Sequence, residues 1–271
     1  MTFIPRESDE TIPGLPEVVD ADTWRNERAQ LLDREKAHTA EADAIAAARR
    51  TLPMVEIDGD AEVHGEDGAV AFRELFDGRD ELIVYKHMWY DGAPHQGQCE
   101  GCTAVAWSLQ DSVYLNARGV SFAVLTSGAW SEVRPYVHFM GYEQPWFSVR
   151  GLDEPLGGDM GSLLSFVRRG DRVFLTYSTT GRGVEPVTGF LGLLDMTPLG
   201  RREGWEDVPE DWPEVPDAGS PVGGRGSPVG WYWRTDDAGR ATWGPTSRPV
   251  PQWTRHGAAP VTSLGRDGHG H

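Results

Sequence analysis

Runs of hydrophobic residues change in length and period along this chain, and the changes predict alternating strands and helices. Two nearly continuous apolar runs, residues 81–88 and 119–126, predict central strands that are buried on both faces. A helix-like segment over residues 104–117 lies between them, and Trp130–Met140 predicts a second helix that Gly141 ends. Two such strands joined through a helix predict a right-handed βαβ unit with parallel strands.

The segments on either side of this unit complete a mixed α/β pattern. Residues 18–50 predict a long helix that Asp20 or Asp22 can cap and Pro53 ends, and we expect this helix to pack on the domain. Its many charged residues are most simply a solvated face. Short strands, many of them in hairpins, are predicted at residues 54–57, 62–64, 69–71, 146–149, 163–167 and 172–176, one helical turn at 72–76, and a closing helix at 187–196.

The two cysteines of the chain, Cys99 and Cys102, stand three positions apart between the first predicted central strand and the helix that follows it. Unpaired N–H groups and a partial positive charge at a helix N-terminus favour thiolate over thiol. A CxxC pair in this βαβ setting indicates redox chemistry or metal binding rather than a structural disulfide.

Composition narrows the range of partners. The net charge is −17 and the sequence pI is about 4.8, which argues against nucleic acid and anionic membranes as partners. No run approaches the roughly 18 apolar residues of a membrane helix, and the first residues show no secretory signal pattern. We therefore expect a cytoplasmic protein whose partner is a protein or small-molecule thiol or disulfide, with homo-oligomerisation as a further candidate.

Domain boundaries follow from shifts in composition. Residues 1–17 hold three prolines and predict an arm, residues 18–202 a single domain, and residues 203–271 an irregular extension rich in Pro, Gly and Trp. Five tryptophans fall in the last sixty or so residues: Trp212, Trp231, Trp233, Trp243 and Trp253. We expect either a small lobe held by aromatic contacts or an arm packed against the domain.

Several blocks of residues, taken in order, resemble a bacterial family of thioredoxin-like proteins recorded as a domain of unknown function. The blocks lie at residues 24–36, 49–53, 75–79, 82–85, 88–103, 139–146, 177–183 and 194–201, and include the stretch from Gln98 to Thr103. The resemblance covers about residues 18–212. It implies an α/β chain of thioredoxin-like fold with an N-terminal helix and a C-terminal extension.

Two departures from thioredoxin itself bear on the chemistry. The residues between the cysteines are Glu100 and Gly101, and a carboxylate there works against thiolate formation through like charge. Thioredoxins also carry a cis-proline just before the hairpin, facing the dithiol, whereas residues 160–162 here contain no proline. Both departures are compatible with a different partner for the two sulfurs, including a metal.

The leading hypothesis is a thiol–disulfide oxidoreductase or thiol-dependent reductase that requires no cofactor. Cys99, nearer the loop, would attack, and Cys102, one turn inside the helix, would resolve the mixed disulfide. Candidate substrate-binding residues are Trp89, Tyr90, Tyr177 and Arg182. Ordinary packing of the aromatic residues and a plain salt bridge of Arg182 are the competing interpretations.

Two other hypotheses belong to different classes. Two thiolates with a histidine suit zinc or copper, for metal handling or metal-dependent oxidation. The candidate ligands are Cys99, Cys102, His95, His87 and His138. The third hypothesis is a binding module whose tryptophan-rich extension recognises a partner.

Overall fold

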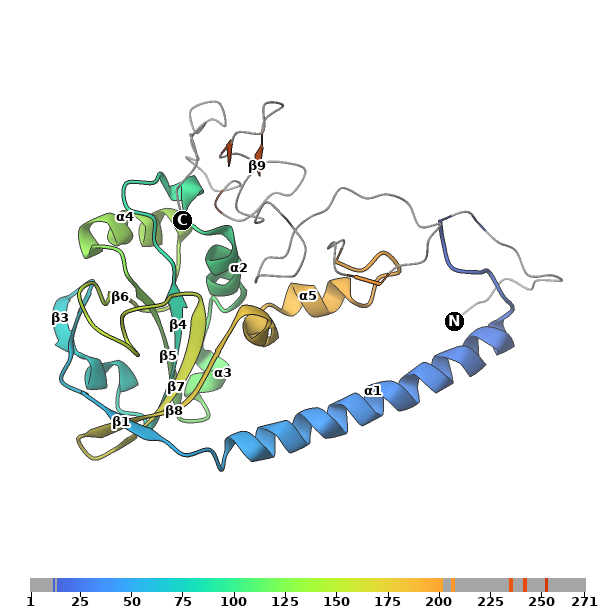
Figure 1. Ribbon diagram of the computed structural model, residues 1–271, viewed down its shortest axis with the longest axis horizontal. Helices are drawn as coiled ribbons and strands as arrows, with labels where there is room; N and C mark the ends of the chain where they lie inside the picture. The colour runs from blue at the N-terminus through green and yellow to red at the C-terminus, as the bar shows by residue number, and fades with distance from the viewer. Residues whose placement is uncertain are drawn as a thin grey trace.

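The computed structural model describes residues 14–201 continuously, and residues 12, 206, 207, 234, 235, 241, 242 and 252 in addition. Its largest element is an eight-stranded sheet in the order β1-β8-β7-β4-β5-β6-β2-β3 (Figure 1). The strands are β1 (Val55–Ile57), β2 (Glu62–Gly65), β3 (Gly68–Ala71), β4 (Glu81–His87), β5 (Val120–Thr126), β6 (Trp146–Ser148), β7 (Ser162–Arg169) and β8 (Arg172–Thr180).

The centre of the sheet is the predicted βαβ unit. β4 and β5 pair in parallel from Glu81↔Val120 to His87↔Thr126, and helix α2 (Glu100–Ser108) connects them. β7 pairs antiparallel with the other edge of β4, and β8 completes the hairpin. A parallel βαβ unit followed by an antiparallel hairpin on the far side of its first strand is a thioredoxin-like arrangement, so the predicted fold class is confirmed.

Alternation along the central strands separates two cores. In β4 and β5, Tyr85 and Val124 belong to the core beneath α2 and α4 (Trp130–Met140), while Val84 and Leu125 belong to the core on the opposite face. Each strand is therefore buried on both faces, which explains why its sequence is a continuous apolar run. Both cysteines lie in the first of these cores.

The helix predicted over residues 104–117 differs from the one observed. α2 begins at Glu100, because Cys99 caps it, and ends at Ser108, because the φ of −119° and ψ of 74° of the next residue, Leu109, leave the helical region. A separate helix, α3 (Val113–Asn116), follows, and Asp111 Oδ1 accepts the Val113 N–H at 2.8 Å. The single predicted helix is thus two short ones.

Other boundaries also shift. Helix α4 has the predicted bounds and ends at Gly141, whose φ of 69° favours glycine. The closing helix predicted at 187–196 is instead α5 (Gly189–Leu194), which follows a 3-10 segment at Gly181–Val187. Two more 3-10 segments cover Phe72–Phe76 and His95–Gly97.

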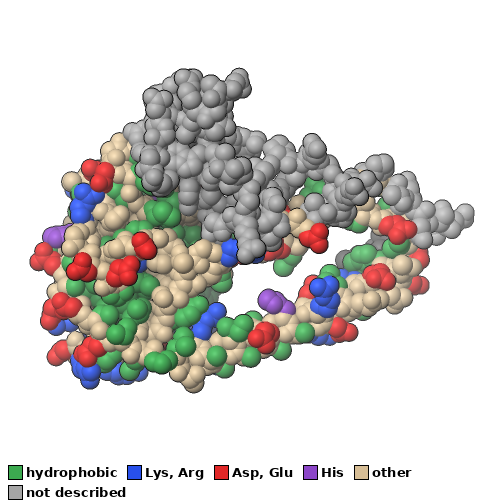
Figure 2. Space-filling view, viewed as in Figure 1, with side chains coloured by type: hydrophobic (Ala, Val, Ile, Leu, Met, Phe, Trp, Pro, Cys, Tyr) green, Lys and Arg blue, Asp and Glu red, His purple; other side chains and the backbone are tan. Residues whose placement is uncertain are grey.

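The N-terminal helix α1 (Ala21–Arg49) extends away from the sheet (Figures 1 and 2). Asp20 caps it as predicted, its Oδ1 accepting the N–H of Asp22 at 2.7 Å and of Thr23 at 3.0 Å. The expectation that it packs on the domain is wrong, because none of its residues is buried. Its larger apolar side chains are too scattered among charges to form one continuous stripe.

The extension is described at only a few positions. β9 (Arg234–Thr235) and β10 (Ala241–Thr242) pair antiparallel. The tryptophans of the predicted extension, and most of the predicted arm, lie outside the described residues. Within the described residues, no helix is long and apolar enough to cross a membrane.

Candidate functional site

The two cysteines occupy the first turn of α2, directly after the loop that leaves β4. Cys99 is the N-cap residue, and its Sγ accepts the Cys102 N–H at 3.3 Å. The two cysteines are not joined in a disulfide, and their exposed fractions are 0% for Cys99 and 1% for Cys102. The predicted CxxC placement therefore brings both sulfurs to one helix terminus, where the helix dipole favours a thiolate.

Hydrogen bonds affect the pKa of the Cys102 thiol more than burial does. Burial alone would raise the pKa of this thiol, but hydrogen bonds with Cys99 and Tyr85, and from the Met88 N–H at 3.4 Å, bring it below the ordinary value. The net direction is downward in spite of the neighbouring Glu100. Because the two sulfurs interact, the first proton lost belongs to the pair rather than to one residue.

Buried hydroxyls support the first turn of α2. Thr103 Oγ1 donates to Cys99 O at 2.8 Å and lies 2.7 Å from Tyr136 Oη, while Tyr142 Oη donates to Thr103 O at 3.4 Å. Burial raises the pKa of both tyrosines, so they remain neutral hydroxyls. Tyr90 behaves alike: burial raises its pKa, and the neighbouring Cys99 and Cys102 raise it further.

His87 is a fully buried neutral imidazole at the end of β4. Burial lowers its pKa to about 3, and Nδ1 lies 2.6 Å from Met88 O, which can only accept, so Nδ1 carries the hydrogen. Nε2 is buried without a hydrogen-bond partner among the described residues. Since Met88 donates its own N–H to Cys102, His87 orients the residue that touches the inner sulfur.

Gln98 is also fully buried, and its hydrogen bonds hold the loop of residues 89–98 beside the cysteines. Its Oε1 accepts the Tyr90 N–H at 3.0 Å, and its Nε2 donates to Tyr90 O at 3.0 Å and Ala93 O at 3.3 Å. Far along the chain, Gln252 is buried too and donates from Nε2 to Gln98 O at 3.1 Å. Sequence reasoning missed Gln98, although its place next to Cys99 was a usable signal.

Trp89 and Tyr90, two of the predicted substrate-binding residues, pack against the core that holds the dithiol. The Trp89 ring meets Tyr136 edge to face at 5.5 Å, and its Nε1–H donates to Glu132 Oε2 at 3.2 Å. Gly128 makes room for this ring, since a Cβ there would stand 2.5 Å from it.

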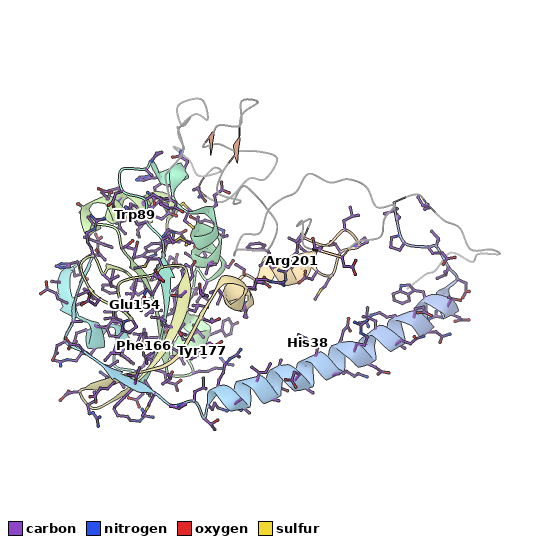
Figure 3. The ribbon with its side chains drawn as sticks, in the orientation of Figure 1. His38, Trp89, Glu154, Phe166, Tyr177 and Arg201 are labelled. Carbon is purple, nitrogen blue, oxygen red and sulfur yellow. The ribbon has the colours of Figure 1, made fainter. Side chains whose placement is uncertain are left out.

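Tyr177 and Arg182, the other two, are not brought to the dithiol. Figure 3 shows Trp89 and Tyr177 toward opposite ends of the sheet. The Arg49 guanidinium carbon lies 5.0 Å from the centroid of the Tyr177 ring. Arg182 Nε donates to Glu185 Oε1 at 2.7 Å. These contacts match ordinary packing for Tyr177 and a plain salt bridge for Arg182, the competing interpretations of the two residues.

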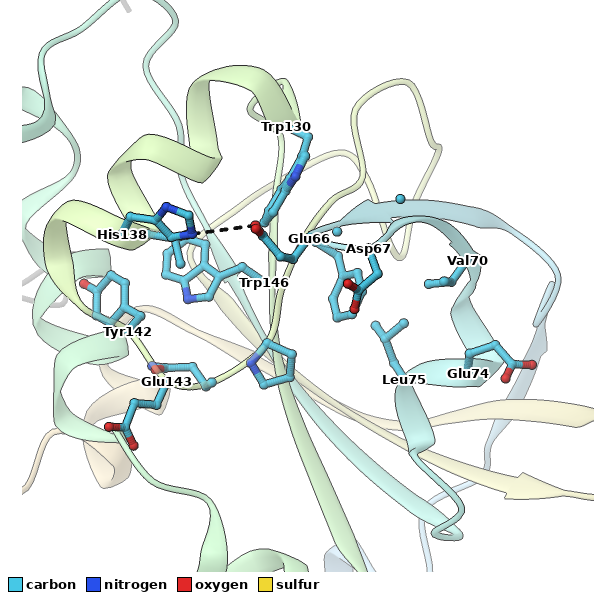
Figure 4. A pocket seen from close by; sticks show the side chains of 16 residues that line it. Glu66, Asp67, Val70, Glu74, Leu75, Trp130, His138, Tyr142, Glu143 and Trp146 are labelled. Atoms are coloured by element: carbon cyan, nitrogen blue, oxygen red, sulfur yellow. Dashed lines mark ion pairs between the residues drawn. The ribbon is translucent and has the colours of Figure 1, made fainter.

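Of the predicted histidine ligands, His87 and His95 lie against the Tyr136 ring and His138 lies elsewhere. The His95 ring lies 5.0 Å from Phe139 and 5.9 Å from Tyr136, and burial lowers its pKa. His138 Nε2 lies 3.7 Å from Glu66 Oε2 in a cavity of about 450 Å³ that neither cysteine lines (Figure 4). Among the described residues, no three His, Cys, Asp or Glu side chains gather as a metal site.

The loop before β7 runs beside the end of β4. Gly161, with φ of 82°, donates its N–H to Lys86 O at 2.6 Å. The buried Lys86 donates from Nζ to Pro155 O at 2.8 Å and Gly157 O at 2.5 Å. Sequence reasoning missed this role, since nothing local marks a lysine in an apolar strand as an anchor for a distant loop.

Comparison with known proteins settles the family. The family model described as "Bacterial protein of unknown function (DUF899)" matches residues 13–238. The chain belongs to this family. None of the curated proteins matches the chain of this DUF899 member.

Solved structures similar to the DUF899 chain are distant. Peroxiredoxin Q of Xanthomonas campestris is 12% identical, covering 53% of this chain and 96% of its own, with a TM-score of 0.35. A secreted Mycobacterium tuberculosis disulfide oxidoreductase is 12% identical, covering 50% and 96%, with a TM-score of 0.30. Thioredoxin of Wuchereria bancrofti is 12% identical, covering 50% and 90%, with a TM-score of 0.33. The site chemistry therefore has to be argued from this chain's own residues.

Proposed function

We propose that this protein is a thiol–disulfide oxidoreductase in which Cys99 and Cys102 cycle between dithiol and disulfide. The observation that carries the proposal is the position of both sulfurs at the N-terminus of α2, where each accepts a backbone N–H. Two thiols that hydrogen-bond one another and share a lowered first pKa are prepared to form a bond with each other.

Each sulfur has a distinct part in the cycle. Cys99 forms the first covalent bond with the oxidised partner, because it precedes the helix and adjoins the loop. Cys102 then attacks Cys99 Sγ and releases the partner, its thiolate being stabilised by the Tyr85 side chain and the Met88 N–H. Oxidation removes two electrons and two protons from the pair, which a second thiol partner restores.

The experiment is the intact mass of the protein after thiol alkylation, run untreated, reduced, and reduced with a chelator. Because the chain has two cysteines, two labels that appear only after reduction identify the Cys99–Cys102 disulfide. Cys102→Ser, which cannot resolve, is expected to stop at the first covalent product on Cys99, a mixed disulfide with a disulfide partner or a sulfenic acid with a peroxide, whereas Cys99→Ser forms neither. A pair that never loses its two labels under any oxidant would overturn the proposal.

The metal-binding alternative has one observation in its favour, the buried Nε2 of His87 without a hydrogen-bond partner among the described residues. Against it, the described residues hold no cluster of three ligand side chains, and His138 lies beside Glu66 instead. The chelator arm of the same experiment separates the two: labels that require chelator as well as reductant indicate a bound metal.

A further inference from the structure

We propose that the oxidant of this dithiol is a small neutral hydroperoxide rather than a protein disulfide. The inference rests on the proposed function and names the substrate class of the same site. It follows from three observations: the complete burial of Cys99, the anchoring of the loop beside it, and the negative charge around it.

The burial of Cys99 limits the size of the oxidant that can reach it. Thiol–disulfide exchange requires the attacking sulfur to reach bonding distance of a substrate sulfur, with the leaving sulfur beyond it. Cys99 has an exposed fraction of 0%, so a protein disulfide cannot approach without displacing what covers it. A hydroperoxide with a few heavy atoms needs a far smaller opening.

The anchoring of the loop of residues 89–98 also limits the size of the oxidant, because this loop is held from several sides. Gln98 makes three hydrogen bonds to it from within. From α4, Glu132 Oε2 accepts the Trp89 Nε1–H at 3.2 Å and the Gly92 N–H at 3.3 Å. Arg150 pairs with Asp91. A large substrate would have to break most of these bonds together, which makes the open state rare.

The negative charge of the protein limits the charge that the oxidant can carry. Glu100 is 4% exposed and adjoins Cys99, and the whole chain carries a net charge of −17. The net charge disfavours the approach of an anionic oxidant. Burial raises the pKa of the Tyr90 hydroxyl, so it stays protonated beside Cys99 and is suited to donate to a leaving alkoxide.

The proposed steps balance. The Cys99 thiolate attacks the terminal oxygen of the hydroperoxide, the O–O bond breaks, and the alkoxide leaves as the alcohol with a proton from the site, which yields Cys99 sulfenic acid. Cys102 attacks Cys99 Sγ, the S–O bond breaks, and hydroxide takes a proton to leave as water. A dithiol reductant then reduces the disulfide, so one hydroperoxide and two thiols give an alcohol, water and a disulfide.

The test compares second-order rate constants for oxidation of the reduced full-length protein by hydrogen peroxide, cumene hydroperoxide and insulin, a protein disulfide. Timed alkylation followed by intact mass reports the loss of both labels. We expect hydrogen peroxide to react at least about 100-fold faster than insulin, because several hydrogen bonds must open for the larger substrate. In Cys102→Ser, dimedone should add once, at Cys99, after peroxide treatment.

Variants of the loop sharpen the test. Gln98→Ala should lower the ratio of the peroxide rate constant to the insulin rate constant by about tenfold, because it frees the loop. If Gln98→Ala fails to fold, Glu132→Gln replaces it. Gln30→Ala, on exposed α1, is the matched control and should leave the ratio unchanged. Insulin reacting as fast as peroxide, or no dimedone adduct, would overturn this inference alone; no disulfide with any of the oxidants would overturn the proposed function as well.

Discussion

Helix α1 spans 29 residues and buries none of them, whereas α2 spans nine and buries seven. α1 is held by its N-cap and by ion pairs within the helix, such as Arg28–Glu35 at 2.8 Å, whose partners are about half exposed. α2 is held by the core beneath it and by buried hydrogen bonds to Thr103 and Cys99.

The difference shows how two helices of one chain can depend on different forces. Exposed ion pairs contribute little to stability, and a solvated helix depends mostly on its own sequence. A buried helix depends on distant residues, and so does any chemistry at its terminus. Equivalent substitutions in α1 and at the dithiol end, defined as α2 with Tyr85, His87 and Tyr136, should therefore have unequal effects.

The largest expected effect is the acid sensitivity caused by His87. Its folded pKa of about 3 lies below the ordinary 6.5, so the unfolded chain binds the extra proton as the pH falls through this window. Stability is then full above about pH 6.5 and declines by up to about 1.4 kcal/mol for each pH unit below it.

Urea unfolding between pH 7 and pH 4 measures this slope. His87→Asn, which keeps a side-chain donor for Met88 O but does not titrate, should flatten it. His38→Gln removes an exposed histidine of α1 and is the matched control (Figure 3). Equal slopes in wild type and His87→Asn would show that the imidazole does not set the acid limit.

A cavity in α2 should cost more than the same kind of truncation in α1. Val105 is 2% exposed, and Val105→Ala removes two buried methyl groups and leaves a void, for a loss of about 2 kcal/mol. Leu31 is 46% exposed, so Leu31→Ala should change the free energy of unfolding by less than about 0.5 kcal/mol. Urea denaturation of the two variants measures both values, and a similar loss in each would mean that α1 packs in solution.

Two threonines give a closer match, because each donates to the carbonyl four residues earlier: Thr103 to Cys99 O at 2.8 Å and Thr39 to Glu35 O at 3.0 Å. Thr103→Val also takes a partner from the buried Tyr136 hydroxyl, so we expect a loss of about 1–2 kcal/mol. Thr39→Val should be nearly neutral. Thermal unfolding of the two variants under reducing conditions compares them directly, and equal shifts in Tm would contradict the assigned role of Tyr136.

The parts of the fold that could be predicted are those whose signal is local. β4 and β5 are apolar runs because both faces are covered, and the CxxC spacing places Cys99 at a helix start. The break at Leu109 was not predicted, since no Pro or Gly marks it. Gln144, distant along the chain, donates from Nε2 to Ala106 O and Leu109 O at this end of the helix. The failure of α1 to pack was missed because charges at helical spacing were taken to cover one face only.

Much of the candidate site depends on contacts that no local pattern encodes. Thr103 meets Tyr136 across 33 residues, and Lys86 anchors a loop 69 residues away. Tyr85 could have been found, because the period of two puts it on the same strand face as His87, which the sequence analysis did single out as a candidate ligand. Their partners on α4 could not, because pairing between distant segments is set by the fold.

The N-caps of the two helices give the smallest expected effect and the finest test of the comparison. Asp20 caps α1 with bonds to the N–H groups of Asp22 and Thr23, which hold its pKa below the ordinary value together with the Thr23 hydroxyl. Asp20→Ala should fray the first turn of α1, seen as faster hydrogen exchange of those amides, while Tm stays the same because nothing in α1 is buried. Cys99→Ala removes the cap of α2, and its exchange should remain slow, because burial rather than the cap protects that turn. A lower Tm in Asp20→Ala would mean that α1 unfolds together with the sheet and that the two helices belong to one cooperative unit.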